Sequence, residues 1–130
     1  MRVVLDAPAC VEFLLGTQLG ARVAGHLIEA EFIHAPELLV SEVISALRGL
    51  LRGGVISEDA ATLALADLGR LDVELVSARD LAPAIWRLAA SHSTYDAHYV
   101  ALASVLGGEL VTTDARLTSA ARGVTMRLVS

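Results

Sequence analysis

The sequence contains no lysine, and its ten basic residues, all arginines, face fifteen acidic residues for a formal charge of −5. Taken alone, this balance argues against a nucleic-acid partner, because phosphates favour a basic surface. Arginine suits bidentate phosphate contacts, but genome base composition also explains a lysine-free, alanine-rich chain, and we give that explanation more weight. A polyanionic partner would therefore need positive charge from another source.

Cysteine and long apolar runs are scarce as well. Cys10 is the single cysteine, which excludes an internal disulfide and makes a reducing cytoplasm the expected location. No apolar run reaches the length of a membrane span, because Asp, Glu, Arg or Gly interrupts each of them. Strand-like residues begin almost at Met1 and leave no room for a secretion signal, so we expect a soluble, cytoplasmic protein.

Hydrophobic residues are abundant. They make up 55% of the 130 residues, only 19% are charged, and the mean hydropathy is +0.60. This length fits one domain spanning residues 1–130. The composition predicts elements that are buried from both sides, as in a layered α/β protein.

Strand and helix patterns alternate along the chain. The patterns predict strands at 2–6, 32–36, 73–76, 109–114 and 124–129, and helices at 8–16, 17–31, 37–51, 57–71, 80–92, 96–108 and 115–123. Pro83 is expected only in the first turn of its helix. Strands separated by helices imply a mostly parallel sheet covered on both faces, and ligands bind such sheets outside the carboxyl ends of the strands.

Four acids stand where they could meet at that edge. Asp6 and Asp114 close two predicted strands, Asp96 opens a helix, and Glu42 falls on the border of an apolar helical stripe. Each has a structural explanation as a turn former, an N-cap, a capping-box residue or a helix flank, and that explanation is favoured for any one of them alone. Their common placement in a chain with few charges favours a shared site.

Four converging carboxylates would repel one another, and protonating them would require strongly raised pKa values. A divalent cation removes this conflict. Oxygen ligands without clustered His or Cys suit Mg²⁺ or Mn²⁺ rather than Zn²⁺. Because such ions are often completed by substrate phosphate, the metal could supply the positive charge that faces a polyanion.

With these motifs, the sequence resembles the PIN-domain ribonucleases, and most closely the VapC-type toxins of bacterial toxin–antitoxin pairs. The resemblance spans nearly the whole chain and rests on the segments "VVLDAPACVEFLLG", "APELLVSEVISALRGL", "TYDAHYVALASVLGGELVTTDARL" and "MRLV". It implies a single PIN-like domain, a three-layer α/β/α sandwich around a parallel sheet, and endoribonuclease cleavage of RNA phosphodiester bonds with Mg²⁺ or Mn²⁺.

The family's acidic site falls on Asp6, Glu42, Asp96 and Asp114 as both catalytic residues and metal ligands, and Thr112 or Thr113 could add a hydroxyl. The resemblance also implies an RNA substrate and a small antitoxin partner. Apolar stripes between residues 37 and 71 exceed what one small core needs, so we expect a homodimer or a toxin–antitoxin hetero-oligomer to use them.

One departure from the family keeps an alternative open. Many members carry Ser, Thr or Asn two residues after the first aspartate, where this chain has Pro8, which offers neither a hydroxyl nor an N–H. The alternative is therefore a catalytically weak or inactive PIN-like module that binds a protein partner. Pro8 also replaces the second acid of a dehalogenase-like phosphatase, and the lack of lysine disfavours a phosphotransfer receiver domain.

Other conspicuous residues receive structural interpretations. His98 is expected to be solvated or at the edge of the core, Cys10 to be a buried small hydrophobe, and Trp86 to lie in the core or an interface. An ordinary surface role is favoured over phosphate contact for three residues near the proposed mouth, namely Arg79, His92 and Arg116.

Overall fold

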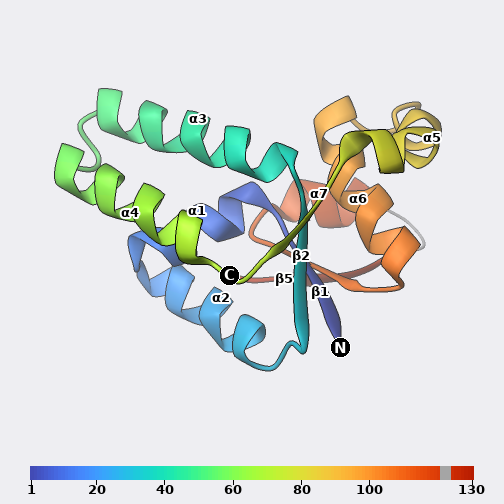
Figure 1. Cartoon of the computed structure of the whole chain (residues 1–130), viewed down its shortest axis with the longest axis horizontal. Coiled ribbons are helices and arrows are strands. Elements are labelled where there is room, and N and C mark those ends of the chain that lie inside the picture. The colour runs from blue at the N-terminus through green and yellow to red at the C-terminus, as the bar shows by residue number, and fades with distance from the viewer. Residues whose placement is uncertain (121–123) are drawn as a thin grey trace.

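A five-stranded parallel sheet forms the centre of the computed structural model, which describes residues 1–120 and 124–130 (Figure 1). In the order β3-β2-β1-β4-β5, neighbouring strands pair in parallel. The strands are β1 (Arg2–Leu5), β2 (Phe32–Pro36), β3 (Glu74–Val76), β4 (Glu109–Thr112) and β5 (Thr125–Leu128). All carboxyl ends of the strands therefore lie along one edge of the sheet.

Helices cover both faces of the sheet, which confirms the predicted α/β/α sandwich. Figure 1 shows α1 to α4 on one side and α5 and α6 on the other. The helices are α1 (Ala7–Leu15), α2 (Gln18–Ile28), α3 (Leu38–Arg52), α4 (Glu58–Arg70), α5 (Ala78–Leu88), α6 (Thr94–Leu106) and α7 (Ala115–Ala120). α6 packs against β1, β2 and β4, and α1 packs against α2, α3 and α4.

Short polar caps fix where the helices begin. Thr17, Ser57 and Ser93 each accept a hydrogen bond at their side-chain oxygen from the backbone N–H three residues on. Gly16 and Gly107 end α1 and α6 in the left-handed conformation, at φ of 66° and 62°, which favours glycine. These caps and glycines therefore set the residues at which the helices begin and end.

The core lies where the central strands meet α1 and α6. Val3, Val4 and Leu5 of β1 are fully buried, as are Leu110 and Val111 of the neighbouring β4. α6 is buried around most of its circumference, which explains why its sequence shows an apolar run more clearly than a one-sided stripe. The site edge is thus supported by the most rigidly packed elements of the chain.

The predicted elements are present, with shifted ends. β4 stops at Thr112, and the predicted helix 115–123 is seen as α7 up to Ala120, its last three residues lying outside the described part. The expectation that Pro83 would sit in the first turn is wrong. Because the Ser77 side chain accepts from the Arg79 N–H, α5 begins early and Pro83 lies inside it, where no N–H faces the carbonyl of Arg79.

No helix in the described part of the chain is both long and apolar enough to cross a bilayer.

Candidate active site

Asp6 joins the end of β1 to the start of α1. Its backbone N–H donates to the Val111 carbonyl at 3.3 Å, and its Oδ1 accepts from the Ala9 N–H at 3.0 Å. Burial raises the pKa of the Asp6 carboxyl from 3.8 to about 6, against hydrogen bonds from Thr112 and Ala9 that lower it. The charges of Asp114 and Glu42 raise it further. Asp6 is therefore the N-cap of α1 and a buried carboxylate whose ionised form would gain from a cation.

The Thr112 hydroxyl connects Asp6 to Asp114. This fully buried side chain hydrogen-bonds the Asp6 carboxylate and accepts the Asp114 N–H at 2.9 Å. Asp114 in turn caps α7, because its Oδ1 accepts from the backbone N–H groups of Arg116 at 2.9 Å and Leu117 at 3.3 Å. Thr112 therefore orients two carboxylates at the ends of adjacent strands, and a hydroxyl ligand from Thr112 or Thr113 stays a prediction.

Arg116 holds Asp96 and Asp114 together. Its Nη2 lies 3.1 Å from Asp96 Oδ2 and 3.1 Å from Asp114 Oδ2. The hydrogen bond to Asp96 is the largest cause of a raised guanidinium pKa, followed by the charge of Asp114. One positive group thus stands between two carboxylates, which is the place a bound cation would take.

Glu42 reaches the same edge from α3. The phenol of Tyr99, on α6, donates a hydrogen bond to Glu42 Oε1 and so ties the two helices together across the end of the sheet. Burial, and then the Glu42 carboxylate, raise the pKa of Tyr99 far above its ordinary value, so the phenol stays a donor. Glu42 is therefore held in place rather than solvated on a helix flank.

A cleft of about 600 Å³ between α1 and α3 opens beside these acids. Its walls include Pro8 and Val11 from α1, Glu42 and Ala46 from α3, and Thr113 after β4. Pro8 lies in the first turn of α1, where its missing N–H costs no hydrogen bond. The cleft gives a substrate a route to the acidic edge past the position at which the family motif differs.

The structure brings all four predicted acids to one edge through a chain of contacts. Glu42 and Asp114 act electrostatically on Asp6, and Arg116 links Asp114 to Asp96. Among the described residues, however, no three acidic, His or Cys side chains already form a metal-binding cluster. The donor set of carboxylates and one hydroxyl suits a hard divalent ion, while Arg116 and Tyr99 occupy part of its binding capacity. The role of the four acids as metal ligands stays a prediction.

Two contributors were missed or underrated by the sequence analysis. Tyr99 follows Asp96 by three residues and so shares its face of α6, a spacing that could have identified it. Arg116 was assigned an ordinary surface role, but it contacts two of the four acids. Its position two residues after Asp114 gives no sign of the contact with Asp96.

Of the remaining interpretations of single residues, two agree with the structure and one does not. Cys10 is buried as predicted, and burial, followed by the charge of Asp6, raises the pKa of its thiol to about 12. His98 is half-buried, with Nδ1 lying 2.7 Å from the Thr94 carbonyl, in line with a place at the edge of the core. A core position for Trp86 is wrong, because this side chain is 82% exposed on α5.

Comparison with known proteins agrees with this architecture. A model of the PIN domain matches residues 3–123. Ribonuclease VapC12 of Mycobacterium tuberculosis is 36% identical over 115 residues, covering 88% of both chains, and Ribonuclease VapC9 of that organism is 39% identical over 116 residues, covering 89% of this chain and 88% of the relative. The structure of VapBC2 from Rickettsia felis, bound to a DNA fragment from their promoter, has a TM-score of 0.72 at 11% identity and covers 100% of both chains. The chain belongs to the PIN-domain family.

Proposed function

We propose that this protein is a metal-dependent endoribonuclease that hydrolyses RNA phosphodiester bonds and acts as the toxin of a toxin–antitoxin pair. The observation that carries the proposal is the linked set of Asp6, Glu42, Asp96 and Asp114 at the carboxyl edge of the sheet. Relatives that are 36% and 39% identical over most of the chain are named ribonucleases. A family that cuts RNA and a site with excess buried negative charge point to the same reaction class.

Asp6, Glu42, Asp96 and Asp114 would hold Mg²⁺ or Mn²⁺. When bound, such an ion lowers the pKa of an attacking water and offsets the charge of the scissile phosphate. The chain's own part is to hold the carboxylates in place and aim them at the ion. Thr112 orients Asp6 and Asp114, Tyr99 orients Glu42, and the start of α6 orients Asp96.

The direct test compares cleavage of a cellular RNA pool by the wild type, Asp114→Asn and the control Asp59→Asn, in Mg²⁺, in Mn²⁺ and in EDTA. Asp59 is an exposed acid in the first turn of α4, away from the site. We expect Asp114→Asn to lose about 10²-fold or more of the cleavage rate, in the range found for removing one group that stabilises transition-state charge. Equal rates for Asp114→Asn and Asp59→Asn, or full activity in EDTA, would contradict the proposal.

A second candidate is a PIN-like module that binds a protein partner without cleaving RNA. Pro8 favours it, because this residue lines the cleft where many family members offer a hydroxyl or amide. Calorimetric titration of the full chain with Mn²⁺ separates the two functions. Binding that is lost in Asp114→Asn supports the nuclease, whereas the absence of binding supports the module.

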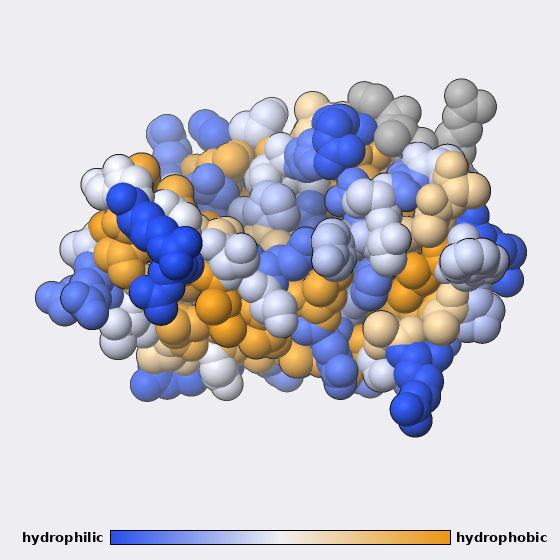
Figure 2. Space-filling model, turned by 90° about the horizontal axis from the view of Figure 1, so that it is seen from above, coloured by the Kyte–Doolittle hydropathy of each residue, from blue (hydrophilic) through white to orange (hydrophobic). Residues whose placement is uncertain are grey.

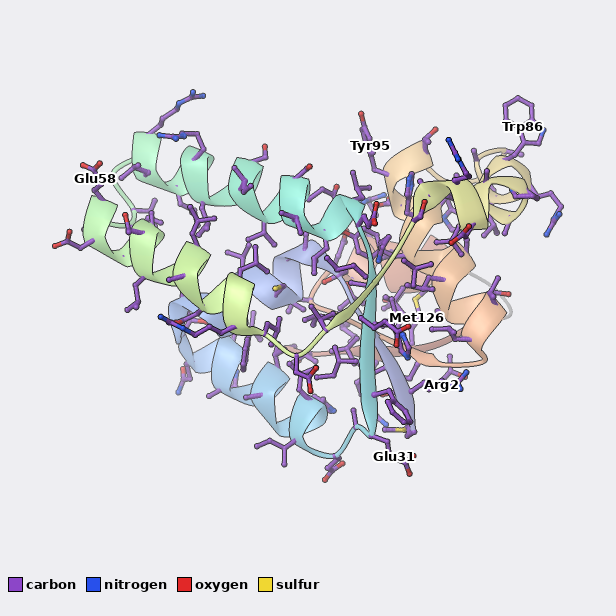
Figure 3. The ribbon with its side chains drawn as sticks, in the orientation of Figure 1. Arg2, Glu31, Glu58, Trp86, Tyr95 and Met126 are labelled. Atoms are coloured by element: carbon purple, nitrogen blue, oxygen red, sulfur yellow. The ribbon has the colours of Figure 1, made fainter. Side chains whose placement is uncertain are left out.

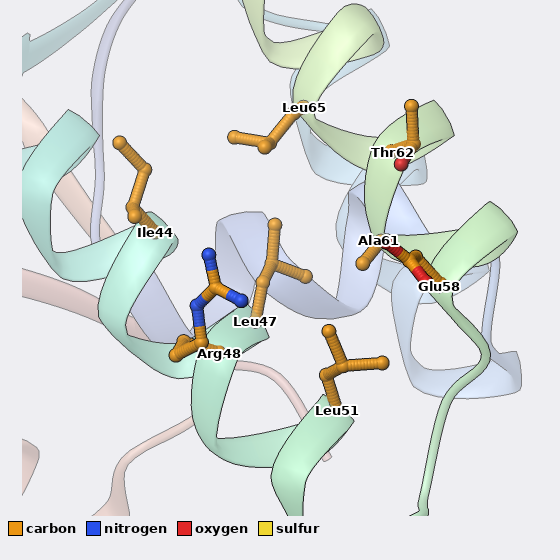
Figure 4. Close-up of a pocket in the computed structure, with 8 residues that line it drawn as sticks. All are labelled: Ile44, Leu47, Arg48, Leu51, Glu58, Ala61, Thr62 and Leu65. Atoms are coloured by element: carbon orange, nitrogen blue, oxygen red, sulfur yellow. The ribbon is translucent and has the colours of Figure 1, made fainter.

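The antitoxin is proposed to bind a groove between α3 and α4. We call this surface the α3–α4 groove; it is lined by Val40, Ile44, Leu47, Leu51, Ala61, Leu65 and Leu68, with Arg48 and Glu58 at one end. Figure 4 shows side chains from both helices converging on its floor, and Figure 2 shows apolar side chains gathered over these helices. A groove with aliphatic walls suits the apolar face of a peptide helix. The resulting complex, or a homodimer formed through the same surface, is expected in the cytoplasm.

A further inference from the structure

Two large aromatic side chains are exposed on α5 and on α6, the helix that carries Asp96. Trp86 of α5 is 82% exposed and Tyr95, in the first turn of α6, is 62% exposed. Figure 3 shows both pointing away from the sheet, on the side toward which the strands run. Tyr99, one turn farther along α6, is buried. The two exposed rings are thus available to a flat partner on the side of the molecule that carries the site.

The chain connects this surface directly to the acids. Tyr95 immediately precedes Asp96, and α5 packs against α6. Arg79 and Trp86 are seven residues apart on α5, so they lie on the same exposed stripe, and Arg87 follows Trp86. We call Arg79, Trp86, Arg87 and Tyr95 the aromatic face. A strand that lay across it would continue toward Asp96.

The segment that carries the aromatic face is slightly basic, although the whole chain is acidic. Residues 77–95 contain Arg79, Arg87 and His92 with a single acid, Asp80. Residues 58–74, by contrast, carry Arg70 against five acids, Glu58, Asp59, Asp67, Asp72 and Glu74. The aromatic face is therefore better suited to a polyanion than α4 and the residues that follow it.

The chemistry of the aromatic face favours unpaired nucleotides over a protein. Proteins that bind single-stranded nucleic acid stack bases on aromatic rings and meet the backbone with arginine. A protein partner has a more suitable surface in the α3–α4 groove, whose walls are aliphatic. The exposed rings and guanidinium groups suit the bases and phosphates of RNA. RNA is also the substrate of the proposed active site.

We infer that Trp86 and Tyr95 form a stacking platform for unpaired RNA nucleotides that flank the scissile phosphate, with Arg79 and Arg87 meeting the RNA backbone. The inference rests on the proposed ribonuclease function and adds the surface, outside the acidic edge, that would hold the RNA. Tyr95 takes the base nearer the acids, and Trp86 takes one farther along the strand.

Trp86 is the only tryptophan, so its fluorescence reports on the face directly. The experiment titrates the full chain in EDTA with a dye-labelled, unstructured oligoribonucleotide and follows dye anisotropy, and repeats the titration with unlabelled oligonucleotide to follow Trp86 emission. We expect RNA to quench the emission, and Trp86→Ala and Tyr95→Ala each to raise the Kd about tenfold, within the range of stacking contacts. Trp86→Phe should keep most of the affinity, and Arg79→Gln should make binding less sensitive to salt.

Phe32→Ala is the matched control, because Phe32 is an exposed aromatic at the start of β2, the opposite end of the sheet. An unchanged Kd in Trp86→Ala, or an emission that RNA does not alter, overturns the inference. It is likewise overturned by an emission shift that follows protein concentration without RNA, which would make the face an interface between copies. Binding is measured without metal or cleavage, so loss of catalysis and loss of stacking give separate results.

Discussion

The acidic edge and the α3–α4 groove each lack a partner, and the two partners differ in kind. At the edge, Asp6 is buried with a carboxyl pKa raised to about 6, and the cation that bridges Asp96 and Asp114 belongs to the exposed side chain of Arg116. In the groove, Ile44 and Leu65 stay substantially exposed although aliphatic neighbours surround them. The acidic edge has more negative charge than positive charge, and the groove has apolar side chains that no other part of the described chain covers.

The difference teaches that the acidic edge and the groove favour different partners. Buried charge at the edge works against folding and favours a cation, because ionised carboxylates are costly in a medium of low polarity. Exposed aliphatic surface in the groove favours a protein partner, because covering it removes apolar area from water. Substitutions in the two regions should therefore affect different measurements.

Asp6→Asn should have the largest effect and should act in two directions. We expect cleavage to fall by about 10²-fold or more, while the metal-free protein gains stability above pH 6. The folded pKa is raised, so the contribution of Asp6 is favourable below its unfolded pKa of 3.8 and is lost as pH rises through about 6. A shift of roughly two units corresponds to about 3 kcal/mol. Denaturant unfolding in EDTA at pH 4.5 and pH 7.5 measures about 2 kcal/mol of this difference, because part of it is already lost at pH 4.5.

The control for this measurement is Asp67→Asn, which removes an exposed acid that pairs with Arg70 on the surface of α4. Its free energy of unfolding should change by no more than about 0.5 kcal/mol at either pH. A wild type that is as stable relative to Asp6→Asn at pH 7.5 as at pH 4.5 would show that burial of Asp6 carries no electrostatic penalty.

Leu65→Asp should weaken antitoxin binding to the α3–α4 groove and leave the acidic edge unaffected. Leu65 is 43% exposed and lines the groove from α4, so a carboxylate there should not unfold the chain but would be buried on binding. We expect the Kd for the co-expressed cognate antitoxin to rise by about ten- to a hundredfold, with RNA cleavage unchanged. Leu63→Asp, at a 61% exposed position of α4 outside the groove lining, is the matched control.

Calorimetry on the purified pair measures this change in Kd, and light scattering on the isolated chain reports on the homodimer. If Leu63→Asp weakens the complex as much as Leu65→Asp, the groove is not the binding surface. A wild-type chain that runs as a clean monomer would count against the homodimer.

Arg116→Ala should have the smallest effect and the most specific one. Removing the guanidinium frees Asp96 and Asp114 for a metal, so we expect Mn²⁺ to bind a few-fold more tightly, since exposed ion pairs contribute little energy each. Arg127→Ala removes another surface ion pair, with Glu109, and should leave Mn²⁺ binding unchanged. Titration calorimetry gives both values, and weaker Mn²⁺ binding in Arg116→Ala would mean that this residue supports the metal site rather than competing for it.

The fold could be predicted from the sequence because local signals and burial agree. Val3 to Leu5 form a short apolar strand followed by a capping aspartate, and Gly16 and Gly107 mark helix ends that only a few residues tolerate. Pro83 was misplaced because the Ser77 cap starts α5 already at Ala78, and packing of α5 against α6 outweighs the hydrogen bond that Pro83 cannot make.

The site could be predicted as a set of acids but not as a network. Asp6, Asp96 and Asp114 lie at the ends or starts of elements, and parallel topology alone brings Asp6 and Asp114 to one edge. The link from Tyr99 to Glu42 spans 57 residues, and the one from Arg116 to Asp96 spans 20. Such pairings depend on how helices pack, which periodicity does not encode.

Cys10 has a practical consequence for work on this protein. A buried thiol with a pKa of about 12 has almost no thiolate at neutral pH, and the thiolate is the species that reacts with electrophiles and oxidants. The natural chain therefore behaves toward maleimide dyes as if it had no cysteine. A cysteine placed at exposed Val105 on α6 would be the single labelling position, and a dye there could report on the motion of the helix that presents Asp96.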